Sequence, residues 1–276
     1  MAMLEAARSF IEAARLAARE LCWSSEAIAL VDIATPYLPE SWVSMELVSE
    51  VAREVSRCTC LWILPGAMAG GEEEAARALP PELRGRVVEL RSMGFASVSV
   101  RVYRRSVSVS VARAPVALAV TRPRTSPYPP LLGSVALAAT YLTLPEHRWA
   151  LFADPRAVDS AIARVFRAAV GRSLAVMDSS HVVACDGPIH GCVDRFLGAA
   201  ALVGEPLSVD WILSRVARAR CSYIDELARL GYSHPQLSGI GSALEAPRLK
   251  THSLSRVLSK GVSGSARGAY QGAKRR

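Results

Sequence analysis

Two apolar runs of strand length, separated by one amphipathic segment of helix length, constrain the fold of this chain more than any other feature. Residues 27–33 are continuously apolar up to Asp32, and the second run, residues 58–64, stops at a Pro-Gly pair. Between them, residues 44–57 repeat apolar side chains at helical spacing. Strand, helix, strand in this order favours parallel pairing through a crossover. We therefore predict an α/β fold with a mixed, mainly parallel sheet flanked by helices.

The segment 96–111 has a different periodicity. Valine alternates there with serine and arginine, so one face of a strand pair is exposed to solvent. This pattern predicts an antiparallel hairpin or sheet edge with a turn near residues 103–105. Apolar runs predict further strands at residues 87–90, 116–120 and 174–177. Amphipathic or apolar segments predict helices at residues 3–22, 135–141, 155–170, 211–220 and 224–230, and an exposed helix within 70–84.

Charge divides the chain into two parts. The net charge is +8, yet residues 245–276 alone hold eight basic residues and one acid, so residues 1–244 are almost neutral. We predict a single α/β domain over 1–244 and a flexible basic tail over 245–276. The tail could hold nucleic acid through Arg267, Lys274, Arg275 and Arg276, or only keep the protein in solution. A diffuse nucleic-acid-binding face on the body has no support in its net charge, although a local patch can survive such averaging.

Composition also bears on the environment of the protein. Asparagine is absent and glutamine occurs twice, which favours a heat-adapted, archaeal-like source, although abundant Arg and Ala also accompany GC-rich genomes. The six cysteines form no paired CxxC pattern, so we expect no intrinsic iron–sulfur cluster. Cys58 and Cys60 fit apolar fillers of a strand better than redox or metal ligands. Without a leader or a run long enough to span a bilayer, we expect a cytoplasmic protein with reduced thiols and no membrane contact.

Polar residues that follow the apolar runs are the candidates for a binding site, because ligands of open α/β sheets bind outside the carboxyl ends of the strands. Arg122 and Arg124 follow the run at 116–120 and could clamp a carboxylate or phosphate, or be solvated loop charges. Asp178 follows the run at 174–177, where it could bind a ligand or only cap the next turn. The candidate ligand-binding residues are Arg122, Arg124, Thr125, Asp178, Asp186, Gly187, His190 and Asp210.

The stretch 178–191 is the richest in reactive groups. It reads Asp-Ser-Ser-His-Val-Val-Ala-Cys-Asp-Gly-Pro-Ile-His-Gly and could transfer protons or present backbone amides to an anion, whereas Asp-Gly-Pro is also an ordinary turn. Cys185 and Cys192 could join His181 or His190 around a metal, but the spacing matches no standard site, and we assign no metal. His147 fits an exposed loop better than a catalytic base. Glycine-rich phosphate loops and a nucleophile elbow are absent, so no catalytic residue is assigned.

The order of these motifs resembles the domain-of-unknown-function family 362 between residues 28 and 231. The resemblance rests on Ala-Thr-Pro-Tyr-Leu-Pro-Glu-Ser, Thr-Arg-Pro-Arg-Thr, Leu-Gly-Ser-Val-Ala-Leu, Leu-Pro-Glu-His-Arg, Leu-Ala-Val-Met-Asp, Asp-Gly-Pro-Ile-His-Gly and Glu-Pro-Leu-Ser-Val-Asp. Members of that family look like α/β proteins, frequently joined to a four-iron ferredoxin module, with a presumed redox or cofactor role.

The resemblance implies roles for particular residues. Arg124 and Thr125 stand where the family has Lys-Thr, Asp178 ends its Asp-Gly strand, and Asp210 matches its late Val-Asp; Gly187, Pro188 and Gly191 match its glycine-rich loop. The chain departs from the family where Ser126 replaces a histidine, residues 136–139 replace a Lys-Asn pair, and the ferredoxin cysteines are missing.

Three functions follow from these observations. We expect a protein that binds a small anionic ligand or an unknown cofactor at the sheet's carboxyl edge, with divergent or lost redox-associated activity. The alternative is a non-enzymatic adaptor that holds nucleic acid or the ribosome through its basic tail. A third possibility is a partner subunit, in which a ferredoxin-like protein supplies the missing iron–sulfur module.

Overall fold

A computed structural model describes residues 4–33, 38–68, 71–127, 129–185, 192–195, 199–219 and 221–232. Its strands are β1 (Leu4–Ala7), β2 (Glu26–Asp32), β3 (Cys60–Gly66), β4 (Phe95–Val102), β5 (Arg105–Ala112), β6 (Ala114–Thr121), β7 (Arg124–Thr125), β8 (Leu131–Leu132), β9 (Val170–Asp178), β10 (His181–Ala184), β11 (Cys192–Arg195) and β12 (Ala201–Gly204). Its α-helices are α1 (Phe10–Leu21), α2 (Met45–Val55), α3 (Glu72–Ala78), α4 (Ser134–Leu142), α5 (Trp149–Phe152), α6 (Val158–Ala169), α7 (Pro206–Val216) and α8 (Ser222–Arg229). Short 3-10 turns are η1 (Pro39–Ser41), η2 (Pro81–Arg86), η3 (Leu90–Ser92) and η4 (Pro145–His147).

The predicted fold class is confirmed. A six-stranded sheet has the order β1-β12-β9-β6-β2-β3 in the described residues. Strands β9, β6, β2 and β3 are parallel, whereas β12 pairs antiparallel with β9 and with β1 at the edge. The segment with alternating valines forms a separate antiparallel hairpin, β4–β5. A small sheet of order β11-β10-β7-β8 accompanies them.

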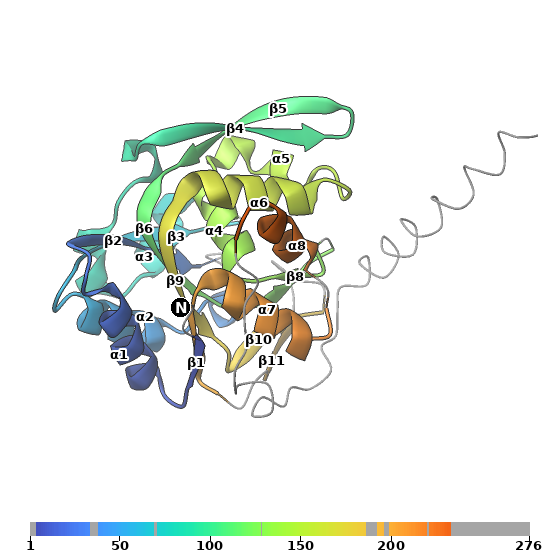
Figure 1. The fold of residues 1–276 in the computed structure, drawn as a ribbon. Coiled ribbons are helices and arrows are strands. Elements are labelled where there is room, and N and C mark those ends of the chain that lie inside the picture. The colour runs from blue at the N-terminus through green and yellow to red at the C-terminus, as the bar shows by residue number, and fades with distance from the viewer. Residues whose placement is uncertain are drawn as a thin grey trace, which may run out of the picture.

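Helices cover both faces of the main sheet (Figure 1). Helices α1 and α2 pack on one face against alternate side chains of the central strands, such as Val31, Val120 and Val176. On the other face, α4, α6, α7 and α8 pack together with the valine face of the hairpin. Because both faces are covered, the central strands are apolar over most of their length, which is why they appear in the sequence as continuous runs.

The connections place a topological switch point between β2 and β6. From β2 the chain crosses through α2 to β3 on one side, and from β6 it crosses through α4 and α6 to β9 on the other side. Strands β2 and β6 are parallel neighbours, so their carboxyl ends, Asp32 and Thr121, meet at one edge. A crevice at such a point is where open α/β sheets bind ligands.

The structure corrects some of the predicted elements. The segment 3–22 is not one helix, since Leu4–Ala7 forms edge strand β1 and α1 begins only after Ser9. Ser9 accepts a hydrogen bond from the backbone N–H of Glu12, which marks the helix start. Residues 87–90 form no strand; Val87 makes an isolated bridge to Ile63 and a 3-10 turn follows. No helix in the described part of the chain has the length and apolar character to cross a membrane.

The expectation of reduced thiols is wrong for three of the described cysteines, Cys22, Cys58 and Cys185. Cys58 lies before β3, not in it, and is joined to Cys22 by a disulfide across a sequence separation of 36 residues. Cys185 is disulfide-bonded as well, so its sulfur is not available as a thiolate ligand for a metal. Cys60 is a free, exposed thiol and not the buried filler that we expected. Disulfides in intracellular proteins are found chiefly in hyperthermophiles; the heat-adapted source and the cytoplasmic location remain predictions.

We expect the Cys22–Cys58 bond to stabilise the fold by restricting the unfolded chain. The double variant C22S/C58S should lose about 3 kcal/mol of unfolding free energy, a fall in Tm of roughly 5–10 °C. Both cysteines are exposed, so serine adds no cavity. The exposed Cys60→Ser serves as the control and should melt with the wild type. Equal melting temperatures for C22S/C58S and C60S would show that the cross-link does not constrain the unfolded state.

Candidate functional site

Asp32, at the carboxyl end of β2, forms the first of two buried ion pairs at the switch point. One of its oxygens accepts hydrogen bonds from Nε and Nη2 of Arg124 at 3.1 and 2.9 Å, and from the backbone N–H of Arg122 at 3.1 Å. Its other oxygen accepts a short hydrogen bond from the hydroxyl of Tyr141. Asp32 and Arg124 are both fully buried, so each charge depends on the other.

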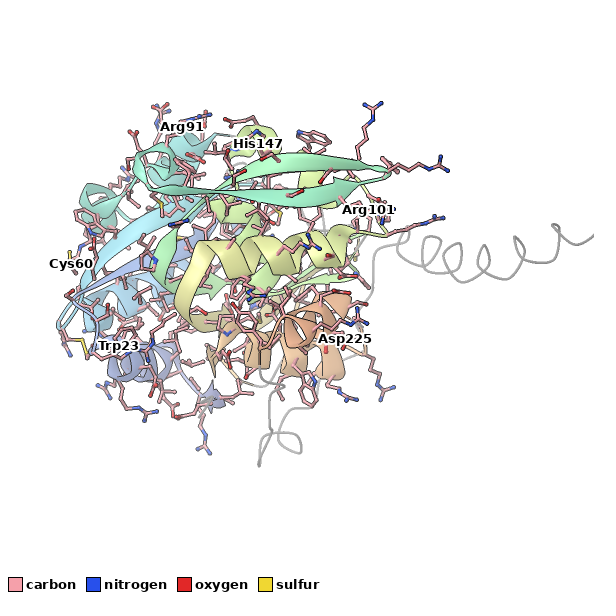
Figure 2. All side chains as sticks on the ribbon, turned by 45° about the horizontal axis from the view of Figure 1, so that its top comes forward. Trp23, Cys60, Arg91, Arg101, His147 and Asp225 are labelled. Atoms are coloured by element: carbon pink, nitrogen blue, oxygen red, sulfur yellow. A yellow bond between two sulfur atoms is a disulfide. The ribbon has the colours of Figure 1, made fainter. Side chains whose placement is uncertain are left out.

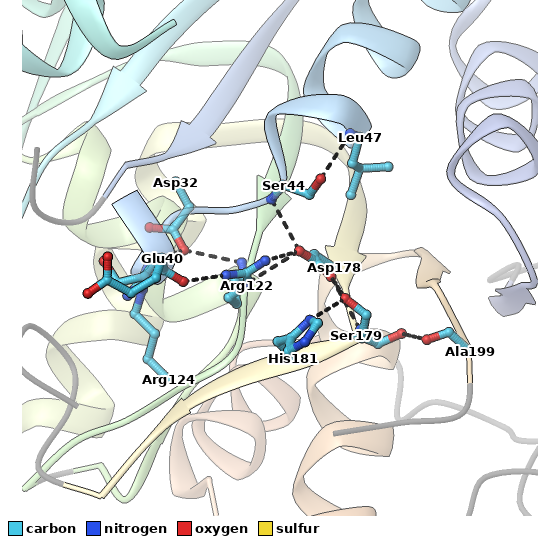
Figure 3. A network of polar contacts seen from close by, with 12 residues as sticks. Asp32, Glu40, Ser44, Leu47, Arg122, Arg124, Asp178, Ser179, His181 and Ala199 are labelled. Carbon is cyan, nitrogen blue, oxygen red and sulfur yellow. Dashed lines mark hydrogen bonds and ion pairs between the residues drawn. The ribbon is translucent and has the colours of Figure 1, made fainter. Parts of the chain in front are cut away.

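Asp178, at the end of β9, forms the second pair. One carboxylate oxygen accepts from Nε and Nη2 of Arg122 at 3.2 and 2.5 Å, and from the backbone N–H of Ser44 at the start of α2 at 3.1 Å. Arg122 also donates from Nη1 to the backbone carbonyl of Glu40 at 2.8 Å. Figure 3 shows these contacts converging from separate segments of the chain. We call Asp32, Arg122, Arg124 and Asp178 the rim quartet.

The rim quartet holds two positive and two negative charges. The ion pair with Asp178 nevertheless does not engage all the N–H donors of Arg122. A guanidinium carries five N–H donors, and hydrogen bonds to Asp178 and Glu40 engage one each on Nε, Nη1 and Nη2. One N–H on Nη1 and one on Nη2 therefore have no partner within the described residues. The side chain of Arg122 is 8% exposed, whereas Arg124 is completely covered. Arg122 is thus the cation through which this rim can meet a ligand.

A relay of hydrogen bonds leads from the rim quartet to an imidazole. The hydroxyl of Ser180 donates to the second oxygen of Asp178 at 2.5 Å and lies 2.9 Å from Nδ1 of His181. Because a carboxylate only accepts, the Ser180 proton points to Asp178, and the Ser180 oxygen is then the acceptor for Nδ1–H of the imidazole. This arrangement leaves Nε2 as the ring nitrogen that is not part of the relay.

Asp210 has a different role, at the amino end of α4. Its oxygens accept from the backbone N–H groups of Ser134 at 2.6 Å and Val135 at 2.9 Å, and from the hydroxyl of Tyr223 at 3.0 Å. Burial raises the pKa of Asp210 to about 7, although these three donors act in the opposite direction. Helix α4 is buried at every position, so its end groups need partners from elsewhere in the fold. Asp210 meets that need. Ser134 links it toward the rim quartet, because its hydroxyl contacts that of Thr121, the residue before Arg122.

The other residues singled out in the sequence lie as follows. Thr125 is buried and donates to the backbone carbonyls of Val183 and Cys185, both at 3.3 Å, so it connects β7 with β10. His147 accepts a hydrogen bond from the backbone N–H of Ser110 at 3.0 Å. Asp186, Gly187, His190 and the tail residues Arg267, Lys274, Arg275 and Arg276 lie outside the described residues, and their roles remain predictions.

Tyr141 is the residue that sequence reasoning overlooked. It lies in an almost wholly apolar helix, and a buried tyrosine hydroxyl nearly always requires a partner. Burial raises the pKa of Tyr141 well above its usual value, and the charge of Asp32 adds to the effect. The phenol therefore stays protonated and donates to Asp32. The signal in the sequence was the tyrosine itself, because its hydroxyl is a polar group in an otherwise apolar helix and would need a buried acceptor.

The fold and the rim quartet define an α/β protein with a doubly wound, mainly parallel sheet and two buried ion pairs at its switch point. No family model matches the chain, and a search of curated proteins finds no match either. Among solved structures, the chain is similar to the lactate racemase apoprotein from Thermoanaerobacterium thermosaccharolyticum, with a TM-score of 0.45 and 11% identity over 79% of this chain. The similarity covers 57% of that protein, a little over half of its length.

Proposed function

We propose that the chain binds a small anionic ligand at the carboxyl ends of β2 and β6, beside the rim quartet. The observation that carries this proposal is that two N–H donors of Arg122, at the switch point, have no partner among the residues that the structure describes. A guanidinium held rigidly by a carboxylate binds a carboxylate or phosphate in fixed geometry, because the side-chain entropy is already lost.

The neighbouring groups suit the same ligand. The imidazole of His181 is joined to Asp178 through the hydroxyl of Ser180, and its Nε2 is not part of that relay. A ligand held by Arg122 could therefore exchange a proton with the imidazole, which is the minimum needed for acid–base chemistry. The resemblance to the domain-of-unknown-function family 362 also remains a proposal. It is supported by Arg124 and Asp178 lying in the rim quartet, and weakened by the missing charged residues.

The test uses Arg122→Lys, since Lys keeps the charge that Asp178 requires but loses the planar fork. Inorganic phosphate and malonate are the probes, titrated by calorimetry. We expect either anion to bind the wild type, R122K to weaken its Kd about tenfold, and H181Q to weaken it a few-fold. Arg113→Lys is the matched control, because Arg113 is exposed near the opposite end of β6 and should leave Kd unchanged.

Two results would contradict the proposal. One is an absence of heat from both anions, together with native mass spectra of the purified protein that show no retained small molecule. The other is equal weakening by R122K and R113K, because binding would then follow overall charge and not the rim.

A further inference from the structure

Arginines and serines supply most of the residues that line a groove on the other side of the molecule from α1 and α2, together with Val100, Ala157 and Ala161. It lies between the β4–β5 hairpin and α6 and has a volume of about 460 Å³. Its basic lining residues are Arg101, Arg104, Arg105, Arg156 and Arg164. Serines 99, 106 and 160 supply hydroxyl groups, and no acidic residue lines it. In Figure 2, Arg101 lies at the free end of the hairpin, above the start of α6.

The positive charge of this groove is not neutralised within the protein. None of its five arginines forms an ion pair with a carboxylate in the described part of the chain, whereas elsewhere Arg53, Arg77 and Arg91 do. The nearby Asp154 is buried, and its oxygens accept from the backbone N–H groups of Tyr103 and Arg156. A concave site with several uncompensated guanidiniums attracts a polyanion more strongly than a single small anion.

The positions of these residues follow from the elements that carry them. Arg156, Ser160 and Arg164 recur every four residues and so lie on one side of α6 and the turn before it. The hairpin supplies the opposite wall, and its turn is joined to the segment before α6 by the hydrogen bond from Tyr103 N–H to Asp154 at 2.7 Å. Strands and a helix carry Arg101, Arg105 and Arg164, whereas Arg104 and Arg156 lie in the adjoining turns.

An exposed aromatic ring stands at the tip of the hairpin. Tyr103 is 65% exposed and has a φ of 54°, an unusual value for a residue other than glycine. A ring that is presented among arginines can stack on a base, and every base has a face suitable for stacking. A membrane surface would instead favour several apolar side chains at the tip, which the exposed residues Arg101, Arg104 and Arg105 do not provide.

We propose that this groove binds single-stranded nucleic acid, with the five arginines on the phosphates and Tyr103 stacked on a base. This cluster of arginines is compatible with the near-neutral net charge of residues 1–244, because the positive charges lie together while the acidic residues lie elsewhere. This binding would be independent of sequence and strongly dependent on salt. The residues that line the groove include none of the rim quartet.

The experiment measures binding of a fluorescent 20-nucleotide single-stranded RNA to the full-length chain by anisotropy, over a range of salt concentrations. The variant R105Q/R164Q removes one charge from each wall. We expect it to weaken Kd about tenfold and to reduce the slope of log K against log salt by about 1.4. The control R8Q/R15Q removes the same charge from exposed positions at β1 and α1 and should change Kd less than twofold.

A second variant separates stacking from charge. Asn adopts a positive φ readily, so Y103N keeps the turn while removing the ring. We expect Y103N to weaken RNA binding about tenfold and to leave binding of inorganic polyphosphate, which has no bases, unchanged. Equal effects of R105Q/R164Q and R8Q/R15Q would overturn the proposal, as would binding of phosphatidylserine vesicles in preference to RNA. Retained RNA affinity in Y103N would overturn the stacking role of Tyr103.

Discussion

Replacing Asp32 by alanine is expected to lower the unfolding free energy by about 5 kcal/mol, a large part of the stability of a typical domain. The substitution removes the carboxylate that the buried guanidinium of Arg124 binds. It also removes the acceptor of the Arg122 backbone N–H and of the Tyr141 hydroxyl. Each buried donor left without an acceptor costs about 1–3 kcal/mol, and a guanidinium costs more. Urea denaturation monitored by circular dichroism measures the loss.

Replacement of both partners keeps this prediction testable even if D32A folds poorly. The variant D32L/R124M replaces the pair by apolar groups and should be more stable than D32A, because it leaves no buried charge without its partner. The exposed pair of Glu50 and Arg53 is the matched control; E50Q/R53Q should cost less than about 1 kcal/mol. A loss of only 1 kcal/mol in D32A would mean that water or another group reaches Arg124, and that the rim quartet is not a rigid scaffold.

The central sheet could be predicted because its physical cause is local. Strands β2, β6 and β9 lie inside the sheet and are covered on both faces over most of their length, so each contains a continuous apolar run. The hairpin could be predicted for the opposite reason, because one of its faces is exposed to solvent and its residues therefore alternate. Strand β1 is short and lies at the edge of the sheet, paired with the short strand β12, and β10 and β11 lie in the small sheet. Such short segments depend on their partners and not on their own periodicity.

The sequence contains a local signal for the start of α1, but the apolar stripe across residues 3–22 suggested an earlier start. Ser9 and Glu12 have the Ser-x-x-Glu spacing of a capping box, and Glu12 accepts from the backbone N–H of Arg8 at 2.7 Å. That spacing places the helix start after Ser9. The apolar stripe across 3–22 suggested a longer helix, because Leu4 and Ala7 happen to continue the helical period.

The pairing within the site could not be predicted. Sequence placed Arg122, Arg124 and Asp178 at one edge of the sheet, but both clamping of a ligand and solvation remained open for the arginines. The structure shows buried pairs with carboxylates 56 and 92 residues away in the chain. Which arginine meets which aspartate depends on the register between β2, β6 and β9, which no local pattern specifies. Sequence also grouped Asp210 with these residues, whereas its oxygens hold the end of α4.

Asp210 leads to the second large prediction, a loss of about 4 kcal/mol on replacement by alanine. The two N–H groups at the start of α4 and the hydroxyl of Tyr223 would lose their acceptor inside the core. Burial raises the pKa of Tyr223 well above its usual value, so the phenol cannot ionise to relieve the loss. Asp210→Asn retains one acceptor oxygen and should cost about 1–2 kcal/mol.

The pH dependence of stability distinguishes Asp210 from an ordinary helix cap. Its pKa rises from 3.8 to about 7 on folding, so between these values the folded chain holds a proton that the unfolded chain has released. Stability from this group is therefore complete below about pH 4 and falls as pH rises to 7, by at most about 1.4 kcal/mol per pH unit. D210N cannot titrate at this position, so the dependence of its unfolding free energy on pH should lack this contribution. The difference in unfolding free energy between the wild type and D210N should therefore shrink as pH rises. Parallel profiles for the two proteins would show that Asp210 is already ionised in the core.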